Sequence, residues 1–230
     1  MPLRFPEPGE LFEGQYRIES KAGSGGFARI YRAVQRQLER DVALKILKPK
    51  PHEDLDAHSQ EAFESQVVQR FRREARNVAQ LRDPHTVTLY DFGRTSDGLF
   101  YMVFEFVDGK TLNFAANRNQ PIDPERVVDI LQKVLSSLEE AHKLGMLHRD
   151  IKPANIMIFD YLGRTDQVKV LDFGISKAVL HNANVTLQNL TQKNVMMGTP
   201  RYMSPEQLRG DQIGPPGDLY SLGLVAYELL

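Results

Sequence analysis

The stretch LHRDIKPANIMI, from Leu147 to Ile158, carries side chains that could do chemistry. Asp150 can accept a proton from a hydroxyl, Lys152 can neutralise a migrating phosphoryl group, and Asn155 can offer a carbonyl oxygen to Mg²⁺. Asp172, in the segment LDFG, can supply a second oxygen ligand. Each aspartate by itself is as readily a turn or capping residue. Their joint occurrence, in this order and at this spacing, favours a site that handles phosphate and a metal ion.

Two features nearer the N-terminus fit the same chemistry. KAGSGGFARIYRA has glycines at 23, 25 and 26. Small residues let backbone N–H groups approach phosphate oxygens, although a hairpin turn alone would also explain them. In VALKIL, Lys45 shares a strand face with apolar neighbours, and a buried ammonium group needs an anion. Glu74, on the apolar side of a predicted helix, offers one. The alternative is that Lys45 reaches water and Glu74 pairs with a nearby arginine.

The first half of the chain reads mainly as strands. Alternating apolar residues predict strands before and after the glycines, in DVALKIL, in TVTLYDFG and in LFYMVFEFV. The polar, proline-containing residues 48–60 predict a loop, and the segment that follows it, up to Leu81, predicts a helix.

The second half reads mainly as helix. Asp123 is the expected N-cap of a helix that has Pro124 in its first position and Gly145 just past its end. Its expected buried stripe is Val127, Ile130, Leu131, Val134, Leu135 and Leu138. NIMIF and QVKVLDF predict short strands, residues 174–204 a loop, and the last nine residues the beginning of a buried helix.

Composition narrows the class of protein. The chain has 230 residues, 41% of them hydrophobic and 26% charged, which is ordinary for a globular protein. A net charge of −1 argues against nucleic acid as a partner, and the absence of cysteine excludes disulfides and fits a reducing cytoplasm. The start lacks the apolar core of a signal peptide, and the longest apolar run, LGLVAYELL, is too short to span a membrane.

Taken together, the glycine loop, VALK, HRDIKPAN, DFG and GTPRYMSPE resemble a protein kinase of the bacterial, eukaryotic-like serine/threonine type over residues 12–230. The resemblance implies an α+β, two-lobed fold. Residues 1–11 would be an N-terminal extension, 12–107 a β-rich N-lobe and 108–230 a helical, incomplete C-lobe. It also implies ATP-dependent transfer of phosphate to serine or threonine hydroxyls of proteins, with Mg²⁺ or Mn²⁺ as the metal.

The same resemblance implies residue roles. Asp150 would be the catalytic base, Lys152 a γ-phosphate contact, and Asn155 and Asp172 the metal ligands. Lys45 would hold the α- and β-phosphates and pair with Glu74. The remaining nucleotide contacts would be Ala22, Gly23, Ser24, Gly25, Gly26, Ile30, Ala43, Phe104, Glu105, Val107 and Met157. Asp218 would cap its helix and bind backbone near His148.

Regulation and partners follow from the family in the same way. Arg149 would pair with a phosphorylated residue of the segment 172–206, where Thr191 is favoured over Thr186. Autophosphorylation is expected there, and a homodimer would be compatible with it. The resemblance implies further helices after Leu230, so the chain is expected to be a fragment of a longer protein. A cytoplasmic kinase domain is expected, which a part beyond Leu230 could tether to a membrane. The alternative function is a pseudokinase that binds nucleotide or a partner without transfer.

Overall fold

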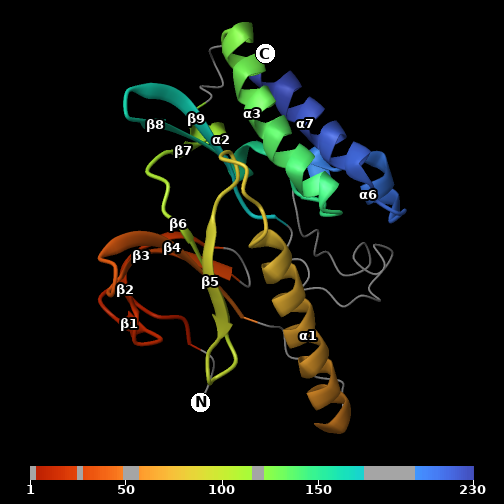
Figure 1. The fold of residues 1–230 in the computed structure, drawn as a ribbon. Coiled ribbons are helices and arrows are strands. Elements are labelled where there is room, and N and C mark those ends of the chain that lie inside the picture. Colours follow the sequence, from red (N-terminus) through yellow and green to blue (C-terminus); the bar gives the residue numbers. More distant parts are fainter. Residues whose placement is uncertain (1–3, 25–27, 49–56, 116–121, 174–199) are drawn as a thin grey trace. The chain divides into compact units, whose positions relative to one another are not determined.

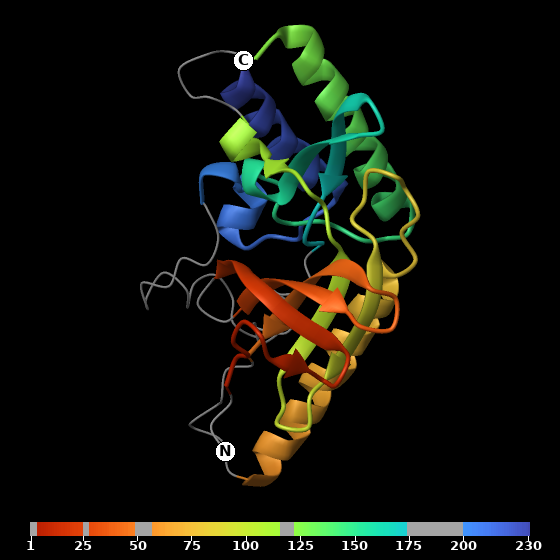
Figure 2. The same cartoon turned by 90° about the vertical axis from the view of Figure 1, so that its left-hand side faces the viewer.

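The computed structural model describes residues 4–24, 28–48, 57–115, 122–173 and 200–230, and in 57–64 and 114–115 the backbone alone. Within these residues the chain forms two compact units. Of the described residues, those within 4–80 and 88–106 form the first unit, and 81–87, those within 107–173, and 200–230 form the second. Figures 1 and 2 show the elements of each unit.

The first unit is built on a six-stranded antiparallel sheet with the order β1-β2-β3-β4-β6-β5. Its strands are β1 (Leu11–Phe12), β2 (Tyr16–Ser24), β3 (Ala28–Gln35), β4 (Arg40–Leu47), β5 (Leu89–Arg94) and β6 (Phe100–Glu105). All the strands predicted for the first half are therefore present.

Alternation along the strands divides the sheet into two faces. One face carries an apolar cluster of Phe12, Tyr16, Ile18, Tyr31, Ala33, Val42, Leu44, Ile46, Leu99 and Val103. The hydroxyl of Tyr16 donates to Asp91 Oδ2 at 2.8 Å. Because burial disfavours the charged phenolate, the pKa of Tyr16 is raised above its ordinary value, and the neighbouring carboxylate raises it further.

Helix α1 (Ala57–Val78) packs on the sheet through Phe71. The Phe71 ring lies 4.7 Å from the ring of Phe100 and 6.0 Å from that of Phe92. The helix begins inside the predicted loop of residues 48–60, so that part of the prediction was wrong. The prediction relied on low apolarity, but a helix start needs only the absence of breakers, and the last proline of the segment is Pro51.

The second unit combines a small sheet with helices. Its three-stranded antiparallel sheet has the order β7-β8-β9. The strands are β7 (Lys110–Thr111), β8 (Ile156–Tyr161) and β9 (Arg164–Val170), and the α-helices are α2 (Leu112–Ala115), α3 (Pro124–Lys143), α6 (Pro205–Arg209) and α7 (Pro215–Leu229). The described residues of this unit also form two 3₁₀ turns, η1 (Pro153–Asn155) and η2 (Pro200–Tyr202). No helix in the described part of the chain is both long and apolar enough to span a bilayer.

Helix α3 has the predicted ends. The side chain of Asp123 accepts from the amides of Glu125 and Arg126 at 2.8 and 3.4 Å, and Pro124 is the first helical residue. Gly145 follows the helix with a φ of 72°, a conformation that favours glycine.

The buried stripe of α3 differs from the predicted one in part. Leu135 is 41% exposed and Leu131 half-buried, whereas Ser137 is fully buried. The Ser137 hydroxyl lies 2.7 Å from Oγ1 of Thr86, which makes burial of this polar group acceptable. A stripe chosen by hydrophobicity alone passes over such a residue.

Helices α3 and α7 lie side by side and run antiparallel, as Figure 1 shows. Ile122, before α3, donates its amide to Leu229 at the end of α7, and His142, near the end of α3, meets Asp218 near the start of α7. Helix α7 begins before the last nine residues, where the sequence predicts the beginning of a buried helix. It begins at Pro215 with Gly214 as its N-cap, so the expectation that Asp218 caps this helix was wrong.

We predict that Asp123→Ala lowers the free energy of unfolding by about 1 kcal/mol, because the first amides of α3 lose their acceptor. Urea titration of both variants measures the effect. The matched control is Asp129→Ala on the same helix. Asp129 is exposed and pairs with Lys133 at 2.6 Å, so its loss should cost less than about 0.5 kcal/mol. Equal losses in the two variants would contradict the capping role.

Candidate active site

Five of the nucleotide-binding residues predicted in the first unit, namely Gly23, Ile30, Ala43, Lys45 and Phe104, share one face of its sheet. Gly23 pairs with Ile30, Ile30 with Lys45, and Ala43 with Phe104. Directly paired residues, and residues two apart on a strand, point to the same side. This face is opposite to the one that carries the apolar cluster. Ala22 and Ser24, also predicted contacts, lie on β2, and Gly25 and Gly26 lie outside the described residues.

Lys45 is only 6% exposed and has a polar interaction partner. The side chain of Glu74 is 34% exposed, and its Oε1 lies 3.4 Å from Nη2 of the adjacent Arg73. That contact matches the alternative in which Glu74 pairs with a neighbouring arginine. The pairing of Lys45 with Glu74 stays a prediction.

In the second unit, the backbone that precedes Asp150 is held by a buried carboxylate. Asp218 is 1% exposed, and it accepts the amide of His148 at 2.8 Å and the amide of Arg149 at 2.7 Å. The predicted contact between Asp218 and backbone near His148 is therefore confirmed. Arg149 has a φ of 63°, a left-handed conformation that costs a non-glycine residue about 1–3 kcal/mol. The hydrogen bonds from the amides to Asp218 hold the backbone in this conformation.

His148 is fully buried, and its hydrogen bonds define its tautomer. Its Nε2 lies 2.7 Å from the carbonyl oxygen of Leu171 and therefore donates, while Nδ1 accepts from the amide of Asp150 at 3.3 Å. The neutral imidazole satisfies both bonds. Burial lowers the pKa of His148 from 6.5, and the negative charge of Asp218 opposes this shift only in part. The ring also packs against Phe173, with 4.7 Å between ring centroids.

Asp150 is held by the residues that were predicted to work with it. Lys152 Nζ lies 2.8 Å from Asp150 Oδ2, and Asn155 Nδ2 lies 3.0 Å from the same oxygen and 2.8 Å from the Asp150 carbonyl. These side chains converge because η1 turns the chain immediately after Lys152. The arrangement orients one carboxylate beside one ammonium group.

The same contacts bear on whether a metal ion fits. The two Asp150 oxygens that contact Asn155 are hydrogen-bond acceptors, so the side-chain amide of Asn155 must direct its nitrogen to them. The side-chain oxygen of Asn155 is thereby turned away from Asp150 and can coordinate a metal ion. The backbone amide of Leu171 donates to the backbone carbonyl of Asn155 at 2.8 Å. This hydrogen bond brings Asp172, the residue after Leu171, near Asn155. One amide oxygen and one carboxylate are the hard donors that Mg²⁺ prefers. The residues therefore fit the predicted metal.

Two predicted adenine contacts also belong to the second unit. Val107 is buried, with 9% of its surface exposed, and Met157 is half-buried on β8, where it pairs with Thr111. Phe104 and Glu105 precede Val107 in the predicted binding segment. They are the last two residues of β6, in the first unit.

The sequence interpretation missed two residues that hold the backbone near Asp150. Gln207 Nε2 donates to the Arg149 carbonyl at 3.1 Å, and His142 Nε2 lies 2.9 Å from Asp218 Oδ2. Gln207 had a sequence signal, because Ser204 and Gln207 form a capping box at the start of α6. His142 had none beyond its place in the last turn of a helix.

Comparison with known proteins identifies the family. A model of the protein kinase domain matches residues 16–230. The solved kinase domain of PknI from Mycobacterium tuberculosis has a TM-score of 0.70 at 25% identity, with 98% of this chain and 77% of that one covered. The chain therefore belongs to the protein kinase family, and the predicted α+β kinase-like fold is confirmed. Use of ATP and a divalent metal is general in this family.

Three similar proteins with curated names are serine/threonine kinases. The chain is 38% identical to the serine/threonine-protein kinase pkn3 of Myxococcus xanthus over 96% of its own length and 38% of that protein. It is 40% identical to PknB of Mycobacterium leprae over 94% of its length and 32% of that protein. It is 36% identical to PrkC of Bacillus subtilis over 96% and 31%. The chain thus spans about a third of the length of these relatives.

We predict a pH dependence of stability that comes from His148. A lowered folded-state pKa means that the unfolded chain takes up a proton at a pH where the folded chain does not. The contribution of His148 to stability is therefore complete above about pH 6.5 and is lost as the pH falls below it. Chemical denaturation from about pH 7 to pH 5 should show a steeper loss in the wild type than in His148→Phe, which cannot titrate. Identical slopes would contradict the assignment, whatever the absolute stability of the variant.

Proposed function

We propose that this chain transfers the γ-phosphoryl group of ATP to serine or threonine hydroxyls of protein substrates. The observation that supports this most is the binding of one Asp150 carboxylate oxygen by both Lys152 and Asn155, at 2.8 and 3.0 Å. A carboxylate held in this way can accept the hydroxyl proton while the hydroxyl oxygen attacks phosphorus. The bond between the γ-phosphorus and the bridging oxygen then breaks, and ADP leaves.

Lys152 supplies a positive charge beside the position of the proton transfer. Its ammonium group can contact a γ-phosphate oxygen and neutralise charge that develops during transfer. The same lysine, two residues after Asp150, supports the serine/threonine class rather than the tyrosine class by resemblance.

The other predicted residues bind and orient ATP. Mg²⁺, when held by Asn155 and Asp172, would neutralise the charge of the β- and γ-phosphates. Lys45, in the first unit, is proposed to hold the α- and β-phosphates. Gly23 has no side chain to block the approach of backbone N–H groups to phosphate. Ile30, Ala43 and Phe104 offer apolar surface for adenine on the same face of that sheet.

We predict that Asp150→Asn lowers phosphate transfer by a factor on the order of 10² or more, because the amide cannot accept the hydroxyl proton. Transfer from radiolabelled ATP to a generic protein substrate gives the rate, and a fluorescent ATP analogue gives nucleotide affinity, which should change little. Asp160→Asn is the matched control, since Asp160 is an exposed carboxylate on β8. Nucleotide binding without transfer in the wild type would instead support the pseudokinase alternative.

We also propose that the chain phosphorylates itself at Thr191, which lies outside the described residues. Arg149 is exposed, while its amide is bound by Asp218 and its carbonyl by Gln207. An arginine whose backbone is fixed in this way needs to order only its side chain to bring its guanidinium group to a phosphate. A transient homodimer would bring the Thr191 of one chain to Asp150 of another.

For this proposal we expect Thr191→Ala to reduce both self-phosphorylation and the later rate of substrate phosphorylation, with ATP affinity unchanged. Phosphopeptide mass spectrometry after incubation with Mg²⁺ and ATP locates the modified residue. Thr186→Ala is the comparison, because Thr186 is the other candidate. Phosphate on Thr186 alone, or wild-type activity in Thr191→Ala, would overturn the choice of Thr191.

A further inference from the structure

The carboxylate of Asp218 receives a third hydrogen bond that comes from another helix. Its Oδ1 accepts the amide of Arg149, and its Oδ2 accepts the amide of His148. The ring of His142, in the last turn of α3, reaches the same Oδ2 with its Nε2, at 2.9 Å. Asp218 is 1% exposed, so protein donors replace water around its charge.

The direction of the His142 hydrogen bond follows from chemistry. An ionised carboxylate only accepts, so Nε2 must carry a proton and donate. Both the neutral Nε2–H tautomer and the imidazolium form have that proton. The contact therefore does not depend on which of these two forms is present, and a charge-assisted bond of this kind is among the stronger ones in proteins.

The geometry makes His142 a restraint on the carboxylate from an element other than the loop. His148 and Arg149 bind Asp218 from the segment that leads to Asp150, whereas His142 binds it from α3. Without the imidazole, the amide of His148 would be the one remaining donor to Oδ2 among the described residues, and the carboxylate could turn about its side-chain bonds. The left-handed backbone of Arg149 would then lose part of what holds it.

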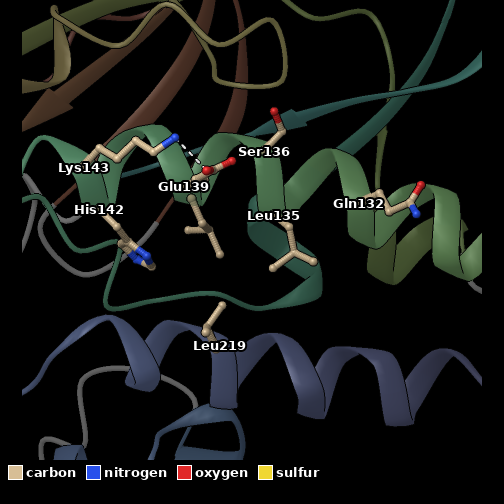
Figure 3. Close-up of a pocket in the computed structure, with 8 residues that line it drawn as sticks. Gln132, Leu135, Ser136, Glu139, His142, Lys143 and Leu219 are labelled. Atoms are coloured by element: carbon tan, nitrogen blue, oxygen red, sulfur yellow. Dashed lines mark ion pairs between the residues drawn. The ribbon is translucent and has the colours of Figure 1, made fainter.

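His142 lies in a partly exposed pocket between α3 and α7. Figure 3 shows His142 on the side of α3 that faces α7, in a pocket that Leu135 and Leu219 also line. The adjacent Lys143 pairs with Glu139 at 2.6 Å. The His142 side chain is 14% exposed, so it is packed but can be replaced by another polar group without burying that group completely.

We propose that His142 is a positioning residue for phosphoryl transfer. Through Asp218 it holds the amides of His148 and Arg149, and so it sets the place of Asp150, although it touches neither ATP nor substrate. The catalytic part of this inference rests on the proposed kinase function. Its structural part, the restraint on the two amides, does not.

The test compares two amide side chains that differ by one methylene. In His142→Gln the side-chain nitrogen can reach about the place of Nε2, whereas in His142→Asn it falls short. Amide hydrogen exchange at His148 and Arg149 should be about tenfold faster in His142→Asn than in the wild type and should return toward the wild-type rate in His142→Gln. This is about the lower limit of what is expected for the loss of one hydrogen bond to a charged group. Lys143→Gln, a neighbouring change in the same pocket, should alter neither amide.

Kinetics provide the second readout. We expect kcat to fall about tenfold in His142→Asn with the KM for ATP within about twofold of the wild type, and to recover in His142→Gln. A merely structural role would lower the amount of folded protein in both variants without this difference between them. His142→Leu serves as a second loss variant if His142→Asn does not fold.

The outcomes separate the two claims. Unchanged exchange at His148 and Arg149 in the loss variants, or equal acceleration in the Gln and Asn variants, would overturn the positioning role. Faster exchange with unchanged kcat would overturn its catalytic part. A wild-type chain that transfers no phosphate would contradict the proposed kinase function, and the exchange measurement would still decide whether His142 restrains the loop.

Discussion

The segment before Asp150 depends on one buried negative charge. A carboxylate removed from water is stable only when donors surround it, and Asp218 finds these donors in the loop and in α3. The need of Asp218 for donors has two consequences. It fixes the backbone of His148 and Arg149 in a conformation that an arginine would otherwise avoid, and it fixes where the start of α7 lies against the end of α3. The position of Asp150 is therefore a consequence of helix packing as much as of its own motif.

A second constraint orders the first unit. Because strand residues alternate, consecutive side chains of a strand lie on opposite faces of the sheet, and β3 and β4 therefore each contribute residues both to the apolar cluster and to the other face. Tyr31, Leu44 and Ile46 belong to the packed face, and Ile30, Ala43 and Lys45 to the other. The residues proposed to bind ATP are thus neighbours across strands, and the alternation that builds the core also brings them together.

Much of this arrangement could be predicted from local sequence. The strands, the capped start of α3, the turn through HRDIKPAN and the common face of Ala43 and Lys45 follow from short-range patterns, because caps and alternation are properties of a few consecutive residues. The predictions that were wrong concern long-range packing or polar segments. The exposure of Leu135 depends on what α3 packs against, which propensity does not record. Helix α1 starts early because no breaker follows Pro51 in its polar segment, and α7 starts at Pro215, a residue type suited to the first helical position.

The sequence by itself determined that three candidate catalytic groups lie together, since Asp150, Lys152 and Asn155 are so close in the chain that one turn must bring them together. It also determined the family, because several motifs occur in order. Only the tertiary structure decided how that turn is held. His142 and Asp218 are 76 residues apart, and Ser137 and Thr86 are 51 apart. Contacts of this kind exist only after α3 has packed against its neighbours, because no local pattern states which distant polar group will satisfy a buried one.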